Sequence, residues 1–456
     1  MYIGENMNTE TIFYHIYPLG FCGAPAVNDF SSAPCGRLEK VYEWTDHLKS
    51  MNVNALYLGP LFESSAHGYD TADYYYVDRR LGNNETLKYL VKHLHENGIK
   101  VILDGVFNHT GRNFWAFRDV QQNLGASQYC SWYNLNFNEK SSYGDPFSYE
   151  GWNGNYDLVK LNLSNPEVKN HLLAAVQMWI EEFDIDGLRL DAADCVDINF
   201  LQELSRFTKS LRSDFWLLGE IIHGDYRKWA NEQTLDSVTN YECFKGLYSS
   251  HNDKNYFEIA YSLNRQFGAA GMYRHLNLYN FTDNHDVSRV ASLLKEKANI
   301  YPLYILLFTM PGIPSVYYGS EWGIEGIKQN GSDSILRPEV SLKNLYETGD
   351  NNILETVKKL SEIRLHYKSL CSGEYRQIHV SSQQFVFSRQ KEEETAIIVV
   401  NSEPSFKSFE LNAQFSNGTK FYDKLNNNAV YTVHNNKIRI EKLFSRWGCI
   451  LVNRKG

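Results

Sequence analysis

The chain has 456 residues, of which 43% are hydrophobic and 22% are charged. This balance is typical of a folded globular protein of two or three domains, and it excludes a disordered chain. The net charge of −9, with no basic stripe, argues against nucleic acid as a partner.

The beginning of the chain, its longest apolar run and its cysteines set further limits. The opening MYIGENMNTE has no basic residue and no apolar core, so we expect no secretory signal. The apolar run from Tyr301 to Tyr318 is interrupted by Pro311, Gly312 and Pro314, so we expect no membrane contact. Seven cysteines without metal-ligand spacing predict free thiols in a reducing compartment, the cytoplasm.

Short apolar runs alternate with helical periodicities along most of the chain. The predicted strands are Ile12–Tyr17, Ala55–Gly59, Lys100–Val106, Gly187–Asp191, Trp216–Glu220, Ser237–Tyr241, Leu276–Phe281 and Ser315–Tyr318. Helical patterns between them include Leu87–Glu96, Val168–Phe183, Leu201–Leu211 and Phe257–Phe267. This alternation predicts an α/β fold, specifically a closed (β/α)8 TIM barrel.

Two segments interrupt the alternation. Residues 110–157 show no clear β/α unit and are rich in aromatic residues, so we expect an inserted domain. Residues 372–456 have strand-like runs at Phe385–Ser388, Thr395–Asn401 and Lys437–Ile440, which predict a C-terminal β-sandwich. Residues 1–109 and 158–371 are then the barrel. The aromatic residues, 14% of the chain, fit either ordinary packing or stacking on sugar rings.

Charged residues recur where the predicted strands end, and catalytic groups of such barrels lie there. Asp104, Asp191 and Glu220 end the third, fourth and fifth strands, and His285 and Asp286 follow the seventh. Each acid alone is also compatible with capping the next helix, and Asp70 with an ordinary turn. The recurrence of acids at one end of the barrel favours a catalytic site.

Paired carboxyls suit glycosidic bond cleavage, which needs one protonated group and one ionised group. Arg189 lies two residues before Asp191, so strand alternation puts both side chains on the same face. We expect this arginine to keep Asp191 ionised as a nucleophile.

Five motifs in this order resemble those of the α-amylase family of glycoside hydrolases. The similarity runs from Thr11 to about Tyr367, and the terminal sandwich is similar too. The motifs are DGVFNH (Asp104–His109), GLRLDAA (Gly187–Ala193), LLGEIIH (Leu217–His223), FTDNHD (Phe281–Asp286) and PGIPSVYYGSE (Pro311–Glu321). KLNLSNPEV (Lys160–Val168) is similar to the neopullulanase, cyclomaltodextrinase and maltogenic amylase branch. Because the barrel begins almost at once, we expect no extra N-terminal domain of that branch.

The resemblance implies a role for each matching residue. Asp191 is the nucleophile, Glu220 the general acid and base, and Asp286 the acid that holds the distorted sugar. The two catalytic carboxyls of such a retaining enzyme lie about 5–5.5 Å apart. The implied substrate-binding residues are Tyr69, Asp70, His109, Arg189, His223, His285 and Arg289.

The implied activity is retaining hydrolysis of α-glucosidic, mainly α-1,4, bonds in short maltooligosaccharides, cyclodextrins or related α-glucans. A transglycosylase or disaccharide-isomerising enzyme of the same fold is the alternative, and a binding protein without catalysis is the third. The partner is an oligosaccharide substrate, and the oligomeric state is left open. Asn108 matches a calcium-binding position of secreted amylases. The loop after the first strand offers only Asp29, so we expect no metal and no cofactor.

Overall fold

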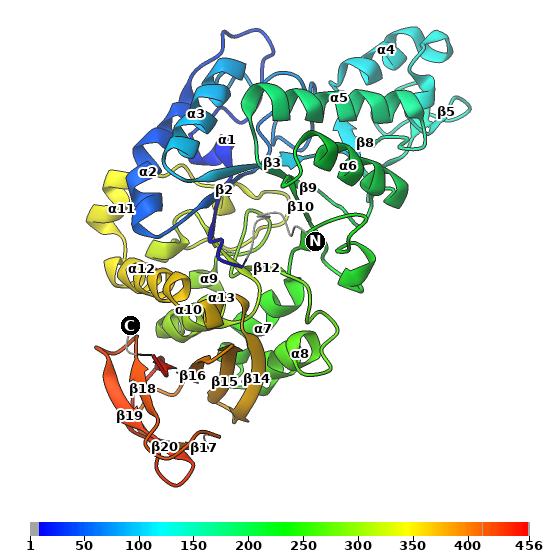
Figure 1. Ribbon diagram of the computed structural model, residues 1–456. Helices are drawn as coiled ribbons and strands as arrows, with labels where there is room; N and C mark the ends of the chain where they lie inside the picture. The colour runs from blue at the N-terminus through cyan, green and yellow to red at the C-terminus, as the bar shows by residue number, and fades with distance from the viewer. Residues whose placement is uncertain (1–8, 413, 455–456) are drawn as a thin grey trace.

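The computed structural model describes residues 9–412 and 414–454 (Figure 1). Most of the opening decapeptide on which the signal-peptide expectation depends lies outside the described residues. In the part of the chain that is described, no helix is long and apolar enough to cross a membrane.

Eight parallel strands form the central sheet, in the order β11-β10-β9-β3-β2-β1-β13-β12. A parallel bridge between Thr239 and Tyr279 joins the two outer strands and closes the barrel. The strands are β1 (Phe13–Ile16), β2 (Ala55–Leu58), β3 (Lys100–Gly105), β9 (Gly187–Leu190), β10 (Trp216–Gly219), β11 (Ser237–Val238), β12 (Tyr279–Phe281) and β13 (Ile313–Tyr317). The prediction of a TIM barrel is therefore confirmed.

Two predicted strands are shorter than expected. The sixth predicted strand, Ser237–Tyr241, stops at Val238, because Asn240 caps the following helix and Tyr241 begins it. The seventh strand starts at Tyr279 rather than Leu276, because Leu276 closes a turn onto the carbonyl of Tyr273. Local capping and turn bonds thus override the apolar pattern at these ends.

Helices surround the barrel, and the long ones begin with clear sequence signals. The Asn165 side chain accepts a hydrogen bond from the Glu167 amide, and Pro166 occupies the first turn of α5. The helices are α1 (Pro18–Phe21), α2 (Lys40–Ser50), α3 (Asn84–Glu96), α4 (Trp115–Asn123), α5 (Pro166–Phe183), α6 (Ile198–Leu211), α7 (Tyr241–Asn252), α8 (Phe257–Phe267), α9 (Val290–Leu293), α10 (Ile300–Thr309), α11 (Leu342–Thr348), α12 (Asn351–His366) and α13 (Lys368–Ser372).

The insert after β3 has its own small sheets, which sit beside α5 and α6 (Figure 1). They are formed by β4 (His109–Gly111), β5 (Leu135–Asn136), β6 (Ser148–Tyr149), β7 (Gly151–Trp152) and β8 (Asn155–Lys160), paired as β4-β8-β7 and β5-β6. The insert also contains α4, which the sequence analysis did not predict. This helix has no side-chain cap at Phe114, and only Ala116, Phe117 and Val120 are buried, so its sequence signal is weak.

The C-terminal strands form two antiparallel sheets, β14-β15-β16-β21-β18-β19 and β17-β20. The strands are β14 (Glu374–Val380), β15 (Gln384–Lys391), β16 (Glu394–Asn401), β17 (Lys407–Asn412), β18 (Lys420–Asp423), β19 (Ala429–Thr432), β20 (Lys437–Leu443) and β21 (Trp447–Val452). Alternation along β16 sends Ile397 and Val399 into a core shared with β17 and β20. Ile398 and Val400 join the barrel core instead, where α10 and α13 cover the sheet (Figure 1).

Candidate active site

Four acidic side chains gather at the C-terminal end of the barrel. Asp104 lies in β3, Asp191 directly follows β9, and Glu220 directly follows β10. Asp286 lies in the loop after β12. All but Asp286 are at most 9% exposed, so these charges interact strongly with one another.

Arg189 connects three of the acids. One guanidinium nitrogen, Nη1, donates to Asp104 Oδ1 at 3.0 Å and to Asp191 Oδ1 at 3.0 Å. A second nitrogen lies 2.9 Å from Glu220 Oε2. The side-chain alternation expected from the sequence places Arg189 and Asp191 on the same side of β9, which allows this contact.

The pKa of Asp191 depends on burial and on its charged neighbours. Burial raises the pKa of Asp191 well above its usual range, and the charges of Glu220, Asp104 and Asp286 add to the effect. Arg189 opposes this shift but does not cancel it, because its charge is shared among three carboxylates. The expectation that Arg189 keeps Asp191 ionised stays a prediction.

The pKa of Asp286 is shifted in the opposite direction. Burial disfavours its charge, but His285 and Arg337 outweigh this and hold the pKa of Asp286 well below its usual range. His285 Nε2 lies 2.9 Å from Asp286 Oδ2, and Arg337 donates to Asp286 Oδ1 at 2.9 Å. The pKa values of Asp191 and Asp286 are thus shifted in opposite directions.

Aromatic and imidazole rings surround the acids. The Tyr69 ring stacks on His285 with centroids 5.4 Å apart, and its hydroxyl bonds to His285 Nε2 and donates to Asp104 at 3.1 Å. His109 Nε2 lies 3.9 Å from Asp191 Oδ2. Burial lowers the pKa of His109 to about 3, so this imidazole is neutral at physiological pH.

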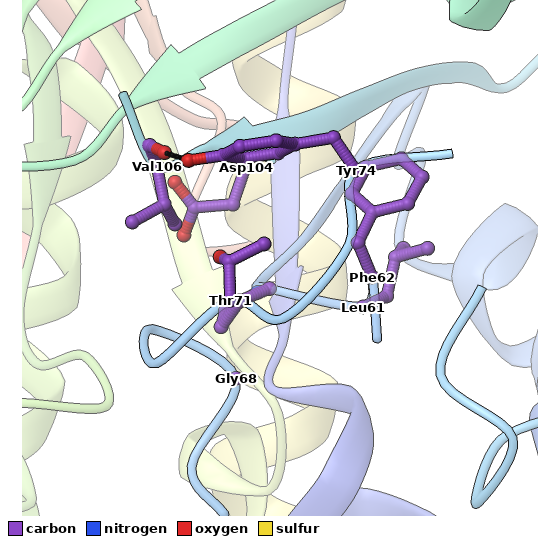
Figure 2. A pocket seen from close by; sticks show the side chains of 8 residues that line it. Leu61, Phe62, Gly68, Thr71, Tyr74, Asp104 and Val106 are labelled. Atoms are coloured by element: carbon purple, nitrogen blue, oxygen red, sulfur yellow. Dashed lines mark hydrogen bonds between the residues drawn. The ribbon is translucent and has the colours of Figure 1, made fainter. Parts of the chain in front are cut away.

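Asp104 also faces a small cavity beneath the loop that follows β2. Figure 2 shows this cavity, lined by Leu61, Phe62, Thr71, Tyr74 and Val106 among others. The Tyr74 hydroxyl donates to the Val106 carbonyl at 2.6 Å and fixes the loop against β3. The cavity is mostly apolar, so it supports the floor of the site rather than holding a sugar.

Three of the predicted binding residues lie apart from the cluster of acids and rings described above. Arg289 was expected to bind substrate, but it is completely buried and donates to the Tyr318 carbonyl at 2.7 Å, so that expectation is corrected to a structural role. Asp70 accepts from the amides of His67 and Gly68 at 3.1 Å, the bonding of a turn residue. His223 is exposed in the loop after β10.

Several residues of the site were not predicted. His15, Tyr57 and Tyr241 point inward from the barrel: Tyr57 donates to Asp104 at 2.8 Å, and Tyr241 donates to Glu220 Oε1 at 3.3 Å. His15 and Tyr57 stack with centroids 4.2 Å apart on the inward face of their strands. Side-chain alternation along these strands could have identified both residues from the sequence. Arg337 comes from a loop without a motif, so only the fold reveals it.

The candidate calcium position is engaged within the protein. The Asn108 side-chain nitrogen contacts His109 Nδ1 at 3.2 Å, and the backbone carbonyl of Asn108 accepts from the Leu161 amide at 3.0 Å. Among the residues described, no group of three or more His, Cys, Asp and Glu side chains is arranged to hold a metal. Independence from calcium stays a prediction.

Comparisons with known proteins agree with this arrangement. The model of the α-amylase catalytic domain matches residues 15–352. The chain is 32% identical to a cyclomaltodextrinase of Geobacillus thermopakistaniensis over 417 residues, covering 86% of this chain and 68% of the relative. It is 31% identical to neopullulanase 2 of Thermoactinomyces vulgaris over 451 residues, covering 92% and 74%. A solved cyclomaltodextrinase superposes with a TM-score of 0.86 at 26% identity, covering 98% of this chain and 78% of that one. The chain belongs to the α-amylase family and is a glycoside hydrolase of that family.

Proposed function

We propose that the protein hydrolyses mainly α-1,4 bonds of short maltooligosaccharides, cyclodextrins or related α-glucans, with retention of anomeric configuration. In this proposal Asp191 is the nucleophile, Glu220 is the general acid and base, and Asp286 holds the distorted sugar. The observation that carries it is the convergence of Asp191 and Glu220 on the Arg189 guanidinium. Two carboxyls on adjacent strands are the minimum that this chemistry requires.

The first step needs one proton on the pair formed by Asp191 and Glu220. Burial raises the pKa of Asp191, and the charge of Glu220 adds to this shift, which favours a proton in the free site. Catalysis requires that proton on Glu220, which gives it to the leaving oxygen as the glycosidic C–O bond breaks. The Asp191 carboxylate attacks the anomeric carbon and forms the glycosyl-enzyme ester.

The second step reverses the roles. Water attacks the anomeric carbon, its proton passes to Glu220, and the ester bond to Asp191 breaks. The ionised Asp286 bonds the sugar hydroxyls while positive charge develops on the ring. Its low pKa keeps this charge available throughout the cycle.

The rings around the acids supply sugar contacts. Tyr69 offers a face for stacking, and His109 and His285 offer nitrogens for hydroxyl groups. His109 Nε2 and His285 Nδ1 are buried and have no hydrogen-bond partner in the described residues, as expected for groups that await a ligand. Asp70 orders the loop that carries Tyr69, and exposed His223 is available to longer substrates.

A substrate panel tests the proposal. The purified protein is incubated with maltotriose, β-cyclodextrin, pullulan, isomaltose and sucrose, and the products are separated by chromatography. We expect cleavage of maltotriose and β-cyclodextrin, with α-configured products by NMR immediately after cleavage. Products of inverted configuration, or cleavage of isomaltose alone, would contradict it.

Transglycosylation is the second candidate function, because a sugar hydroxyl can replace water in the second step. Ile222, two residues after Glu220, is 44% exposed, and an apolar side chain beside the acid favours a sugar acceptor over water. Products longer than the substrate at high substrate concentration would identify this activity.

We also propose that the enzyme works in the cytoplasm. All seven cysteines are free, which suits a reducing compartment. We propose no nucleic acid partner and no membrane partner.

A further inference from the structure

A second cavity lies beside the start of α3, the helix labelled in Figure 1. It has a volume of about 420 Å³, within the range of about 300–1,000 Å³ that is typical of small-molecule sites. Its lining includes Glu63, Tyr76 and Arg79 from the loop between β2 and α3, and Glu85 from the first turn of α3. The four acids of the active site lie outside this lining, so the cavity is a separate site.

The loop after β2 forms part of both sites. Residues 62–77 fold back on themselves through two antiparallel bridges. The tip of this hairpin carries Tyr69, whose hydroxyl bonds to His285 Nε2 in the active site. The base carries Glu63 and Tyr76, and the Glu63 amide donates to the Tyr76 carbonyl at 2.9 Å. Because loops that follow strands lie at the C-terminal end of the barrel, the cavity opens on the same end of the molecule as the acids.

Hydrogen bonds hold the walls of the cavity in place. Glu63 is 5% exposed and accepts from the Arg79 amide at 3.0 Å and from the Asn28 side chain at 3.1 Å. Arg79 Nε also donates to Glu63 Oε1 at 2.5 Å. The Asn84 side chain accepts from the Val77 amide at 2.9 Å and joins the loop to α3. The cavity is therefore pre-formed, and a ligand does not have to order the loop before it binds.

The free groups of the cavity favour a neutral ligand with hydroxyl groups. Tyr76 is 62% exposed, so its ring offers a face for stacking. Within the described residues, the Tyr76 hydroxyl, the terminal nitrogens of Arg79 and the Glu85 carboxylate have no hydrogen-bond partner. Two carboxylates against one guanidinium disfavour an anion such as phosphate. A sugar unit matches this set, because it combines an apolar face with hydroxyls that donate and accept.

We propose that this cavity binds about one or two glucose units of an α-glucan without cleaving them. Tyr76 stacks on the apolar face of a glucose unit, and Arg79 and Glu85 bond its hydroxyls. The inference rests on the proposed function, which supplies the substrate class. A glucan held here stays at the end of the barrel that carries the acids, so the local concentration of cleavable chain rises.

The number of bound sugars tests the second site. In Asp191→Asn, which blocks turnover, isothermal titration calorimetry with maltotriose should find two bound molecules per chain. Tyr76→Ala in the same background should raise the Kd of one site at least about tenfold, because the stacking surface is lost. Tyr76→Phe keeps the ring and should change that Kd less than about threefold. A single bound maltotriose in Asp191→Asn, or two unchanged sites after Tyr76→Ala, would overturn the proposal.

Tyr261→Ala in the Asp191→Asn background is the matched control. Tyr261 is 68% exposed on α8 and lies outside the lining of the cavity. Its removal should leave both Kd values unchanged, because an exposed tyrosine without a cavity beside it does not bind a sugar. Melting curves of all the variants separate loss of folding from loss of binding.

Hydrolysis by the wild type, followed in parallel, separates this proposal from the proposed function. Cleavage of maltotriose together with a single binding site would overturn the second site alone. Absence of cleavage of both maltotriose and β-cyclodextrin would overturn the proposed function itself.

Discussion

The pKa of each acid at the C-terminal end of the barrel depends on how many acids share its positively charged partner. Arg189 contacts three carboxylates, so none of them receives a full counter-ion. Asp286 receives two partners of its own, His285 and Arg337. The opposite pKa shifts of Asp191 and Asp286 follow from this distribution.

Removing either catalytic carboxyl should abolish turnover without unfolding the protein. We expect Asp191→Asn and Glu220→Gln to lower kcat at least about a thousandfold, because one loses the nucleophile and the other the transferable proton. Asp214→Asn is the control, since Asp214 precedes β10 at the opposite end from Glu220 and pairs with Arg212. Steady-state kinetics on maltotriose provide the measurement, and a variant that retains a tenth of wild-type kcat would refute its assigned role.

Ionisation of Asp191 should lower the stability of the folded protein as pH rises. A carboxyl whose pKa is raised on folding binds more protons in the native state, so stability falls as pH rises above about 4, the ordinary pKa of aspartate. Asp191→Asn stays neutral and escapes this loss. Its melting temperature relative to the wild type should therefore increase by about 2 °C or more between about pH 5 and pH 8. A melting-temperature difference that stays constant or shrinks as pH rises would show that folding does not raise the pKa of Asp191.

At the scale of elements, the insert decides the shape of the cleft. Its strand β4 begins at His109, directly beyond β3, and pairs with β8. The insert must therefore stand over the end of the barrel that carries the acids. The β7–β8 turn brings Trp152 to His109, so the insert places an aromatic wall on this side of the site.

This wall should favour short substrates. We expect kcat/KM for maltopentaose or β-cyclodextrin to exceed that for soluble starch at least about tenfold per cleavable bond, about 1.4 kcal/mol of transition-state binding. The physical reason is that a narrow cleft with stacking surfaces excludes a branched polymer but binds an oligosaccharide. Reducing-sugar assays on each substrate decide the matter, and equal efficiencies would mean that the cleft is open at both ends.

At the scale of the whole molecule, the barrel and the C-terminal sheet share one apolar core. Arg389 in β15 is 1% exposed at this junction and donates to the carbonyls of Thr309, Gly373 and Cys371. Burial, together with the charge of Arg364, lowers the pKa of Arg389 to about 9. Arg389 stabilises the junction by donating to three carbonyls rather than by pairing with an acid.

Arg389→Ala should destabilise this junction strongly. Three carbonyls, of which those of Thr309 and Cys371 are buried, lose their donor, so we expect the free energy of unfolding to fall by at least about 3 kcal/mol. Denaturant unfolding monitored by tryptophan fluorescence measures the change. Arg376→Ala serves for comparison, because Arg376 is exposed on β14 and its side chain donates to Gln414. Equal stability of the two variants would show that water replaces the lost donor.

Chelation should leave the molecule unaffected. Asp29 is the one carboxylate in the loop after β1, and Oδ1 already accepts from the amides of Ser31 and Ser32 at 2.8 Å. Calcium requires six to eight oxygen ligands, which this loop does not supply. We expect EDTA to change the melting temperature by less than about 5 °C, roughly 1 kcal/mol for a protein this large. A larger loss, reversed by added calcium, would establish a structural ion.

The sequence by itself determined the barrel, the eight strand positions and the placement of Asp104, Asp191 and Glu220 at strand ends. These features depend on period-two and helical patterns that are local in the chain. The tertiary structure alone decided what each group meets: the three-way sharing of Arg189, the burial of Arg289 behind Tyr318, and the approach of Arg337 to Asp286. It also decided that Trp152 reaches His109. Those contacts join residues far apart in sequence, and desolvation and shared charge arise only after the chain has closed around them.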